Sequence, residues 1–159
     1  MIPLKRILLV EDSENDIELT LAALAEHHIA NHVDVARDGA EALEYLFREG
    51  QYAGRTTGNP VVVLLDLKMP KVDGIEVLRR VKSHPELKLI PVVMLTSSRE
   101  EQDLVRTYQL GVNAYVVKPV GFEKFMESVQ RLGVFWALVN EQPASAGAAA
   151  ETPSNPSDV

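Results

Sequence analysis

The chain has 159 residues, 46% of them hydrophobic and 25% charged, which suits one globular domain of ordinary size. No window approaches the roughly 18 apolar residues of a membrane span, the N-terminus lacks a secretory signal, and the absence of cysteine excludes disulfides, thiolate metal sites and cysteine nucleophiles. The net charge of −7 disfavours nucleic-acid binding, which normally needs a basic patch, so these features favour a cytoplasmic protein that binds neither nucleic acid nor membrane.

Short apolar runs predict strands at residues 7–10, 33–36, 61–65, 91–95 and 114–117. The third run is continuously apolar, as in a strand that is buried on both faces. Segments with a helical period alternate with these runs, and they begin near residue 13 and span residues 39–48, 74–83, 98–111 and 121–132. Ser13 with Asp16, and Ser98 with Glu101, resemble capping boxes at helix starts, and Gly111 suits a left-handed helix stop.

The alternation of strand and helix predicts an α/β fold, with a parallel sheet that carries helices on both faces. The flavodoxin-like strand order 2-1-3-4-5 suits five such units. We expect residues 1–140 to form this domain and residues 141–159, rich in Ala, Ser and Pro, to be a disordered tail. The polar connection at residues 49–60 is longer than usual, and is either an interaction surface or a tolerated insertion.

Polar side chains follow four of the predicted strands. Glu11 and Asp12 follow the first strand, Asp66 closes the third, Thr96 closes the fourth, and Lys118 follows the fifth. Taken singly, each has a structural explanation as a turn residue, a helix cap or a surface charge. Ligands of open α/β sheets bind at the carboxyl ends of the strands, so the convergence of all five at that edge favours a functional site.

The chemistry of these five side chains points to phosphoryl transfer. Three carboxylates repel one another unless a cation joins them, and Mg²⁺ binds through such carboxylates together with phosphate oxygens. Lys118 supplies a mobile positive charge for a phosphoryl group, and Thr96 supplies a hydroxyl donor. Positioning and charge neutralisation account for most of the catalysis in such sites.

Four motifs carry a resemblance to a known family. They are residues 7–12 (ILLVED), 66–70 (DLKMP) with Asp73-Gly74, 93–97 (VMLTS) and 115–119 (YVVKP). In this order and spacing, the sequence from residue 5 to about residue 132 resembles the receiver domain of bacterial two-component response regulators.

The resemblance implies a role for each residue of the site. Asp66 is the expected phosphoacceptor, which takes a phosphoryl group from a histidine kinase. Glu11, Asp12 and Asp66, with the backbone carbonyl of Lys68, are the expected ligands of Mg²⁺. Lys118 is expected to pair with the phosphoryl group.

The resemblance also implies a conformational switch. Thr96 is expected to move toward the phosphoryl group, and Tyr115 to turn inward behind it. Pro119 matches a proline whose preceding peptide the family holds cis.

The apolar pattern of the last helix continues past residue 132 through Phe135 and Trp136. This extension either folds back on the core or covers a partner surface, and aromatic residues favour the partner. With the long loop before the third strand, it resembles stand-alone receivers that serve phytochrome-type histidine kinases. Those receivers tend to dimerise through helix 4, strand 5 and helix 5, so the resemblance implies a homodimer.

The sequence therefore predicts a single-domain response regulator whose output is protein–protein contact. It is expected to be a signalling protein that catalyses its own phosphotransfer and slow dephosphorylation rather than an enzyme. An alternative is a phosphorelay intermediate that passes the phosphoryl group to a histidine phosphotransfer protein. A flavodoxin-like cofactor binder is less favoured, because the acidic segment 11–16 would repel a bare phosphate. A phosphatase would want an aspartate at position 68, and a pseudo-receiver would not need the complete site.

Overall fold

The computed structural model describes residues 6–26, 32–67, 69, 71–96, 111–112, 114–118, 123 and 127. The helix predicted at residues 98–111 lies outside this part except for Gly111, and the tail predicted at residues 141–159 lies outside it entirely. Gly111 has the predicted left-handed backbone, with a φ of 86°. In the described part of the chain, no helix is long and apolar enough to cross a membrane.

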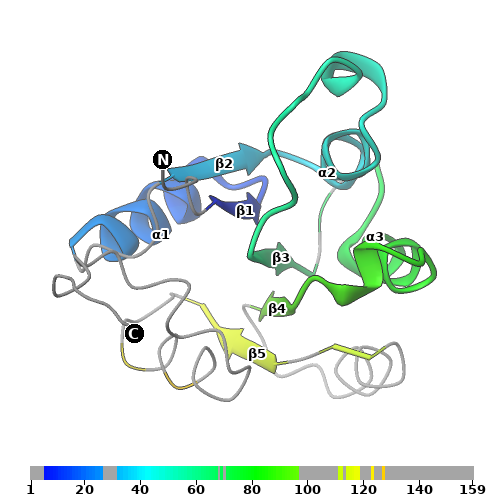
Figure 1. The fold of residues 1–159 in the computed structure, drawn as a ribbon. Helices are drawn as coiled ribbons and strands as arrows, with labels where there is room; N and C mark the ends of the chain where they lie inside the picture. The colour runs from blue at the N-terminus through cyan, green and yellow to red at the C-terminus, as the bar shows by residue number, and fades with distance from the viewer. Residues whose placement is uncertain are drawn as a thin grey trace, which may run out of the picture.

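Five strands in the described residues form one parallel sheet, and its order β2-β1-β3-β4-β5 confirms the predicted one (Figure 1). The strands are β1 (Arg6–Val10), β2 (His32–Ala36), β3 (Val62–Asp66), β4 (Val92–Thr96) and β5 (Ala114–Val117). The described helices are α1 (Glu14–Glu26), α2 (Gly39–Phe47) and α3 (Gly74–Lys82), with short 3-10 turns η1 (Gly50–Tyr52) and η2 (Leu87–Leu89). Each lies where the sequence predicted a strand or helix, apart from the two short turns.

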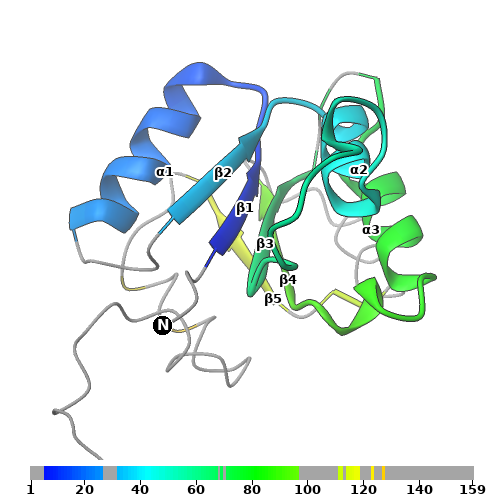
Figure 2. The ribbon, with the colours of Figure 1, turned by 45° about the horizontal axis from the view of Figure 1, so that its top comes forward.

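The sheet is covered on both faces, with α1 on one side and α2 and α3 on the other (Figure 2). Each central strand sends alternate side chains to the two sides, as the pleat requires. Leu8 and Leu65 pack in the core beneath α2 and α3, whereas Leu9 and Leu64 pack in the core beneath α1. Burial on both faces explains why the third run in the sequence is apolar without interruption.

The turn between β3 and α3 is held by a glycine in a tight space. A Cβ on Gly74 would lie 2.3 Å from the backbone oxygen of Asp66. The N–H of Gly74 donates to the carbonyl of Leu67 at 2.9 Å. Asp73 caps the helix, since its Oδ1 accepts the N–H of Glu76 at 2.9 Å. The start of α3 therefore packs closely against the carboxyl end of β3, where the candidate site lies.

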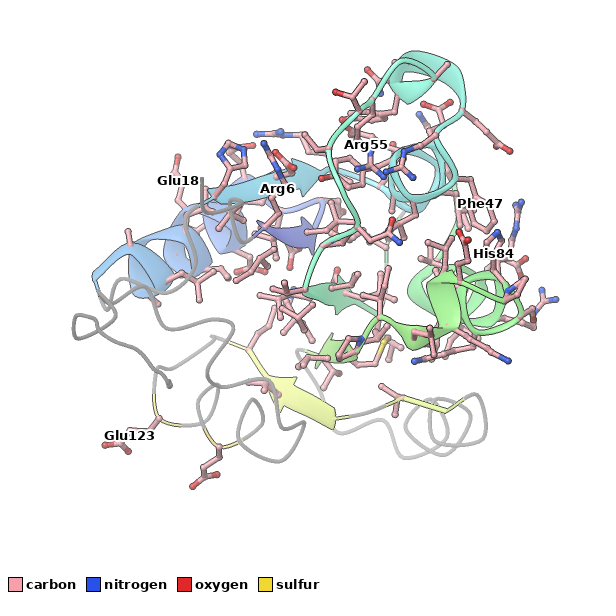
Figure 3. The ribbon with its side chains drawn as sticks, in the orientation of Figure 1. Arg6, Glu18, Phe47, Arg55, His84 and Glu123 are labelled. Atoms are coloured by element: carbon pink, nitrogen blue, oxygen red, sulfur yellow. The ribbon has the colours of Figure 1, made fainter. Side chains whose placement is uncertain are left out.

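The long connection at residues 49–60 packs on α2 through Arg55, which is labelled in Figure 3. The guanidinium group of Arg55 lies 4.1 Å from the centre of the Tyr45 ring and donates to the Tyr45 carbonyl at 2.8 and 3.0 Å. It also donates to the carbonyls of Thr57 at 2.9 Å and Gly58 at 3.1 Å. Arg48 also donates to the Thr57 carbonyl, at 2.5 Å, so two arginines hold the loop against α2.

Candidate functional site

The carboxyl ends of the parallel strands bring the predicted site residues to one edge of the sheet. Backbone hydrogen bonds fix this edge: the N–H of Glu11 donates to Ala36 at 3.0 Å, and the N–H of Lys118 donates to Thr96 at 2.7 Å. Asp66, the last residue of β3, is in register with Leu95 of β4. The sheet therefore positions the site residues, which are the last residues of its strands or follow them directly.

Three carboxylates converge at this edge. Glu11, Asp12 and Asp66 each place an oxygen so that all three atoms lie within 4.8 Å of one another. Glu11 and Asp66 are 1% and 5% exposed, whereas Asp12 faces solvent. Hard carboxylate oxygens in this number suit a divalent cation, and the exposed side leaves room for the water ligands that Mg²⁺ retains.

Lys118 lies at the centre of the site and contacts three carboxylates. Its Nζ is 2.9 Å from Glu11 Oε1, 2.9 Å from Asp16 Oδ2 and 3.2 Å from Asp66 Oδ1. Burial alone would lower the pKa of Lys118, but the hydrogen bonds to Asp16 and Glu11 and the charge of Asp66 outweigh it and raise the pKa. The lysine is therefore a fully charged ammonium group at neutral pH.

Asp66 lies in an environment that disfavours its charge. Burial raises its pKa, the neighbouring carboxylate of Glu11 raises it further, and Lys118 opposes both, with a resulting pKa of about 6. Without a metal ion, the site holds more negative charge than Lys118 neutralises. Added positive charge next to Asp66 would relieve this imbalance.

Thr96 and Tyr115 are placed by their strands. Thr96 is the last residue of β4 and is 4% exposed. Tyr115 lies in β5 opposite Met94, and only its backbone position is described. Four other predicted residues lie outside the described part of the chain: Lys68, Pro119, Phe135 and Trp136.

Asp16 is a further member of the site, although its spacing from Ser13 predicted a capping role. The predicted capping box is half formed, because Ser13 Oγ accepts the N–H of Asp16 at 3.3 Å. The reciprocal bond goes to a different carboxylate, since the N–H of Ser13 donates to Glu11 Oε2 at 3.1 Å. The carboxylate of Asp16 turns to Lys118 instead.

The model of the response regulator receiver domain matches residues 7–130 of this chain. This match covers well over half of the sequence, and the strand order and the acidic edge agree with it. The chain belongs to the response regulator receiver domain family. It is a signalling protein of two-component systems, as the four sequence motifs predicted.

Among similar proteins, response regulator Rcp1 of Synechocystis sp. is 40% identical over 143 residues, covering 90% of this chain and 96% of Rcp1. The solved structure of the bacteriophytochrome response regulator AtBRR is 64% identical, with a TM-score of 0.80, covering 88% of this chain and all of that one. The solved structure of the phosphorylated cyanobacterial phytochrome response regulator RcpA is 44% identical, with a TM-score of 0.70, covering 84% of this chain and 94% of that one. These likenesses confirm the predicted resemblance to regulators of phytochrome-type systems.

Proposed function

We propose that Asp66 accepts a phosphoryl group from a histidine kinase and that the phosphorylated protein signals through contact with partner proteins. The observation that carries the proposal is the position of Asp66. It is a buried carboxylate at the end of a central strand, 3.2 Å from the Lys118 ammonium and grouped with Glu11 and Asp12. The phosphorylated state of the similar regulator RcpA supports it.

The proposed step is an in-line phosphoryl transfer. An Oδ atom of ionised Asp66 attacks the phosphorus of the kinase phosphohistidine, so that an O–P bond forms and the P–N bond breaks. The bonding electron pair returns to the imidazole nitrogen. With a pKa of about 6, Asp66 is largely ionised at neutral pH and ready to act as the nucleophile. Lys118 then stabilises charge on the phosphoryl oxygens.

The acidic group fits a divalent cation, for which we propose Mg²⁺. Glu11, Asp12 and Asp66 are the ligands the described residues offer, and the backbone carbonyl of Lys68 is the further ligand we expect. A bound cation would neutralise charge on the transferring phosphoryl oxygens. Support comes from the solved structure of the Mn²⁺-bound form of the similar regulator Rcp1. That structure is 41% identical to this chain, with a TM-score of 0.68.

Phosphorylation is proposed to switch the protein through Thr96 and Tyr115. A phosphoryl group adds about −1.5 to −2 charges and three acceptor oxygens, which attract the Thr96 hydroxyl. Space vacated by Thr96 would admit the Tyr115 ring. Shifting such a switch from 1:99 to 99:1 needs about 5.5 kcal/mol, much of which a few charge-assisted hydrogen bonds can supply.

We propose a phytochrome-type histidine kinase as the phosphoryl source, acting in the cytoplasm. The likeness to the bacteriophytochrome response regulator AtBRR, at 64% identity, supports this choice. We also propose a homodimer that uses β5, the helices predicted on either side of it, and the segment with Phe135 and Trp136. The aromatic composition of that segment supports the second proposal.

Intact-mass measurement tests the phosphorylation. The protein is incubated with acetyl phosphate and Mg²⁺, and we expect a gain of one phosphoryl group that Asp66→Asn abolishes. Glu14→Gln serves as a control for loss of a carboxylate near the site, since Glu14 is exposed and pairs with Arg37. An equal gain in Asp66→Asn would refute the proposal.

Phosphotransfer profiling tests the partner. Autophosphorylated kinases, including a red-light receptor kinase, are mixed one at a time with the protein, and the rate of label transfer is measured. We expect the fastest transfer from the phytochrome-type kinase. Faster transfer from an unrelated kinase would contradict the proposed phytochrome-type partner but not the proposed phosphorylation of Asp66.

A further inference from the structure

We propose that Asp16 is a positioning residue that holds the Lys118 ammonium in place for the phosphoryl group. This inference rests on the proposed function and deepens it. Asp16 makes one of the two shortest contacts of Lys118, at 2.9 Å, although it lies two positions inside α1 and 102 positions before the lysine.

The side chain of Asp16 is not needed for the capping bond that its spacing from Ser13 predicts. A carboxylate three residues after a capping serine normally accepts the backbone N–H of that serine. Here Glu11 Oε2 accepts the N–H of Ser13 at 3.1 Å. Because that donor is already bonded, Asp16 can turn to Lys118 without a loss to the start of the helix.

Three carboxylates share the Lys118 ammonium group. An ammonium group has three protons, and Lys118 has a carboxylate oxygen within 3.2 Å for each of them. Two of these carboxylates, Glu11 and Asp66, belong to the acidic group that suits a metal ion, whereas Asp16 does not. A cation held by that group would compete with Lys118 for Glu11 and Asp66 and would repel the lysine. Asp16 is the contact that such competition leaves intact.

Phosphorylation of Asp66 would change the contacts of Lys118. To bind a phosphoryl oxygen, Lys118 must give up one of its three contacts. The contact with Asp66 is the longest at 3.2 Å, and Asp66 is the proposed site of phosphorylation, so the phosphoryl oxygen replaces it. Asp16, which lies outside the acidic group, then keeps the ammonium group directed at the phosphoryl group.

Affinity for beryllofluoride, a phosphoryl mimic, tests this role in the full chain with saturating Mg²⁺. We expect Asp16→Asn to weaken binding about tenfold, as for a lost hydrogen bond between charged groups. Asp16→Glu, which restores the carboxylate, should recover part of the loss.

Glu14→Gln is the matched control, because it removes the same charge from the same first turn of α1 at a 63% exposed side chain. We expect Glu14→Gln to change the affinity for beryllofluoride less than about twofold, because solvent screens the charge of an exposed carboxylate. If Asp16→Asn binds as well as the unchanged protein or better, or if Glu14→Gln loses as much, the positioning role is wrong. Tighter binding would mean that Asp16 competes with the phosphoryl group for the lysine.

A double-mutant cycle shows whether Asp16 acts through Lys118. Asp16→Asn should have no further effect on beryllofluoride affinity once Lys118→Met is present. An undiminished effect in that background would overturn the proposal, since it would show that Asp16 acts independently of the lysine.

A metal-free readout separates this inference from the proposed function. The buried, hydrogen-bonded Lys118 ammonium should give a slowly exchanging NMR signal that Glu14→Gln retains and Asp16→Asn loses. A signal that persists in Asp16→Asn overturns the positioning role. If the unchanged protein fails to bind beryllofluoride, the proposed function falls; if it binds and Asp16→Asn binds equally, only the positioning role falls.

Discussion

Asp66 is a carboxylate kept where its charge is unfavourable. It is 5% exposed and has Glu11 and Asp12 beside it, and the Lys118 ammonium group offsets only part of the resulting repulsion. The proposed nucleophile therefore destabilises the metal-free fold. Functional sites commonly hold groups with such perturbed pKa values.

Asp66→Asn should therefore stabilise the metal-free protein. The pKa of Asp66 rises from 3.8 to about 6 on folding, so the fold favours the protonated form. The stability that this preference gives is complete below pH 3.8 and is lost as the pH rises through about 6. At neutral pH we expect a gain of about 1 to 2 kcal/mol, less than the full shift implies because relaxation of the surrounding groups and water penetration lower the cost of the buried charge.

Urea unfolding in the presence of a chelator measures this gain. It should grow as the pH rises from acid to neutral and then level off. A variant that is less stable than the unchanged protein at neutral pH would contradict the electrostatic account of the site.

At the scale of elements, the close contact between α3 and the end of β3 positions Asp66. Gly74→Ala places a Cβ 2.3 Å from the backbone oxygen of Asp66, so the backbone must shift. We expect a loss of about 1 to 3 kcal/mol in unfolding free energy, as for other overpacked sites. Phosphorylation by acetyl phosphate should also slow, because the nucleophile is displaced.

Gly54→Ala is the control for this prediction, since no described heavy atom lies within 4 Å of where its Cβ would stand. It should change neither stability nor phosphorylation. Equal behaviour of the two variants would show that the contact at Gly74 does not position Asp66.

The guanidinium group of Arg55 makes several of the hydrogen bonds that hold the loop at residues 49–60. Arg55→Ala removes its bonds to Tyr45 and Thr57 and its contact with the Tyr45 ring. We expect faster amide exchange at Tyr52 and Ala53, whose N–H groups donate within the loop to the carbonyls of Glu49 and Gly50, with little change in phosphorylation. Arg55→Lys keeps the charge but cannot fork, so it should resemble the alanine variant. Full protection in Arg55→Lys would show that charge alone closes the loop.

For the whole molecule, the sheet could be predicted from the sequence, because strands that are buried on both faces appear as short, continuous runs of apolar residues. The site edge followed from it, since parallel strands bring their carboxyl ends together. The role of Asp16 could not be read from the sequence, because its spacing from Ser13 favoured a capping bond and its partner is 102 positions away. The packing of Arg55 on Tyr45 was missed for a related reason, as loop residues carry no periodic pattern.

The proposed homodimer uses the segment that contains Phe135 and Trp136. Truncation after residue 132 removes Phe135 and Trp136, and we expect a mass near that of the dimer before truncation and of the monomer after it. Light scattering at several concentrations measures this. An unchanged mass would exclude the aromatic segment from the interface.

The most direct test of the whole account is the location of the phosphoryl group. Borohydride reduction of the phosphorylated protein converts an aspartyl phosphate to homoserine, which peptide mapping then locates. We predict homoserine at position 66 and at no other carboxylate of the site. Reduction at Glu11, Asp12 or Asp16 with Asp66 unchanged would contradict the assignment of Asp66 as the phosphoacceptor.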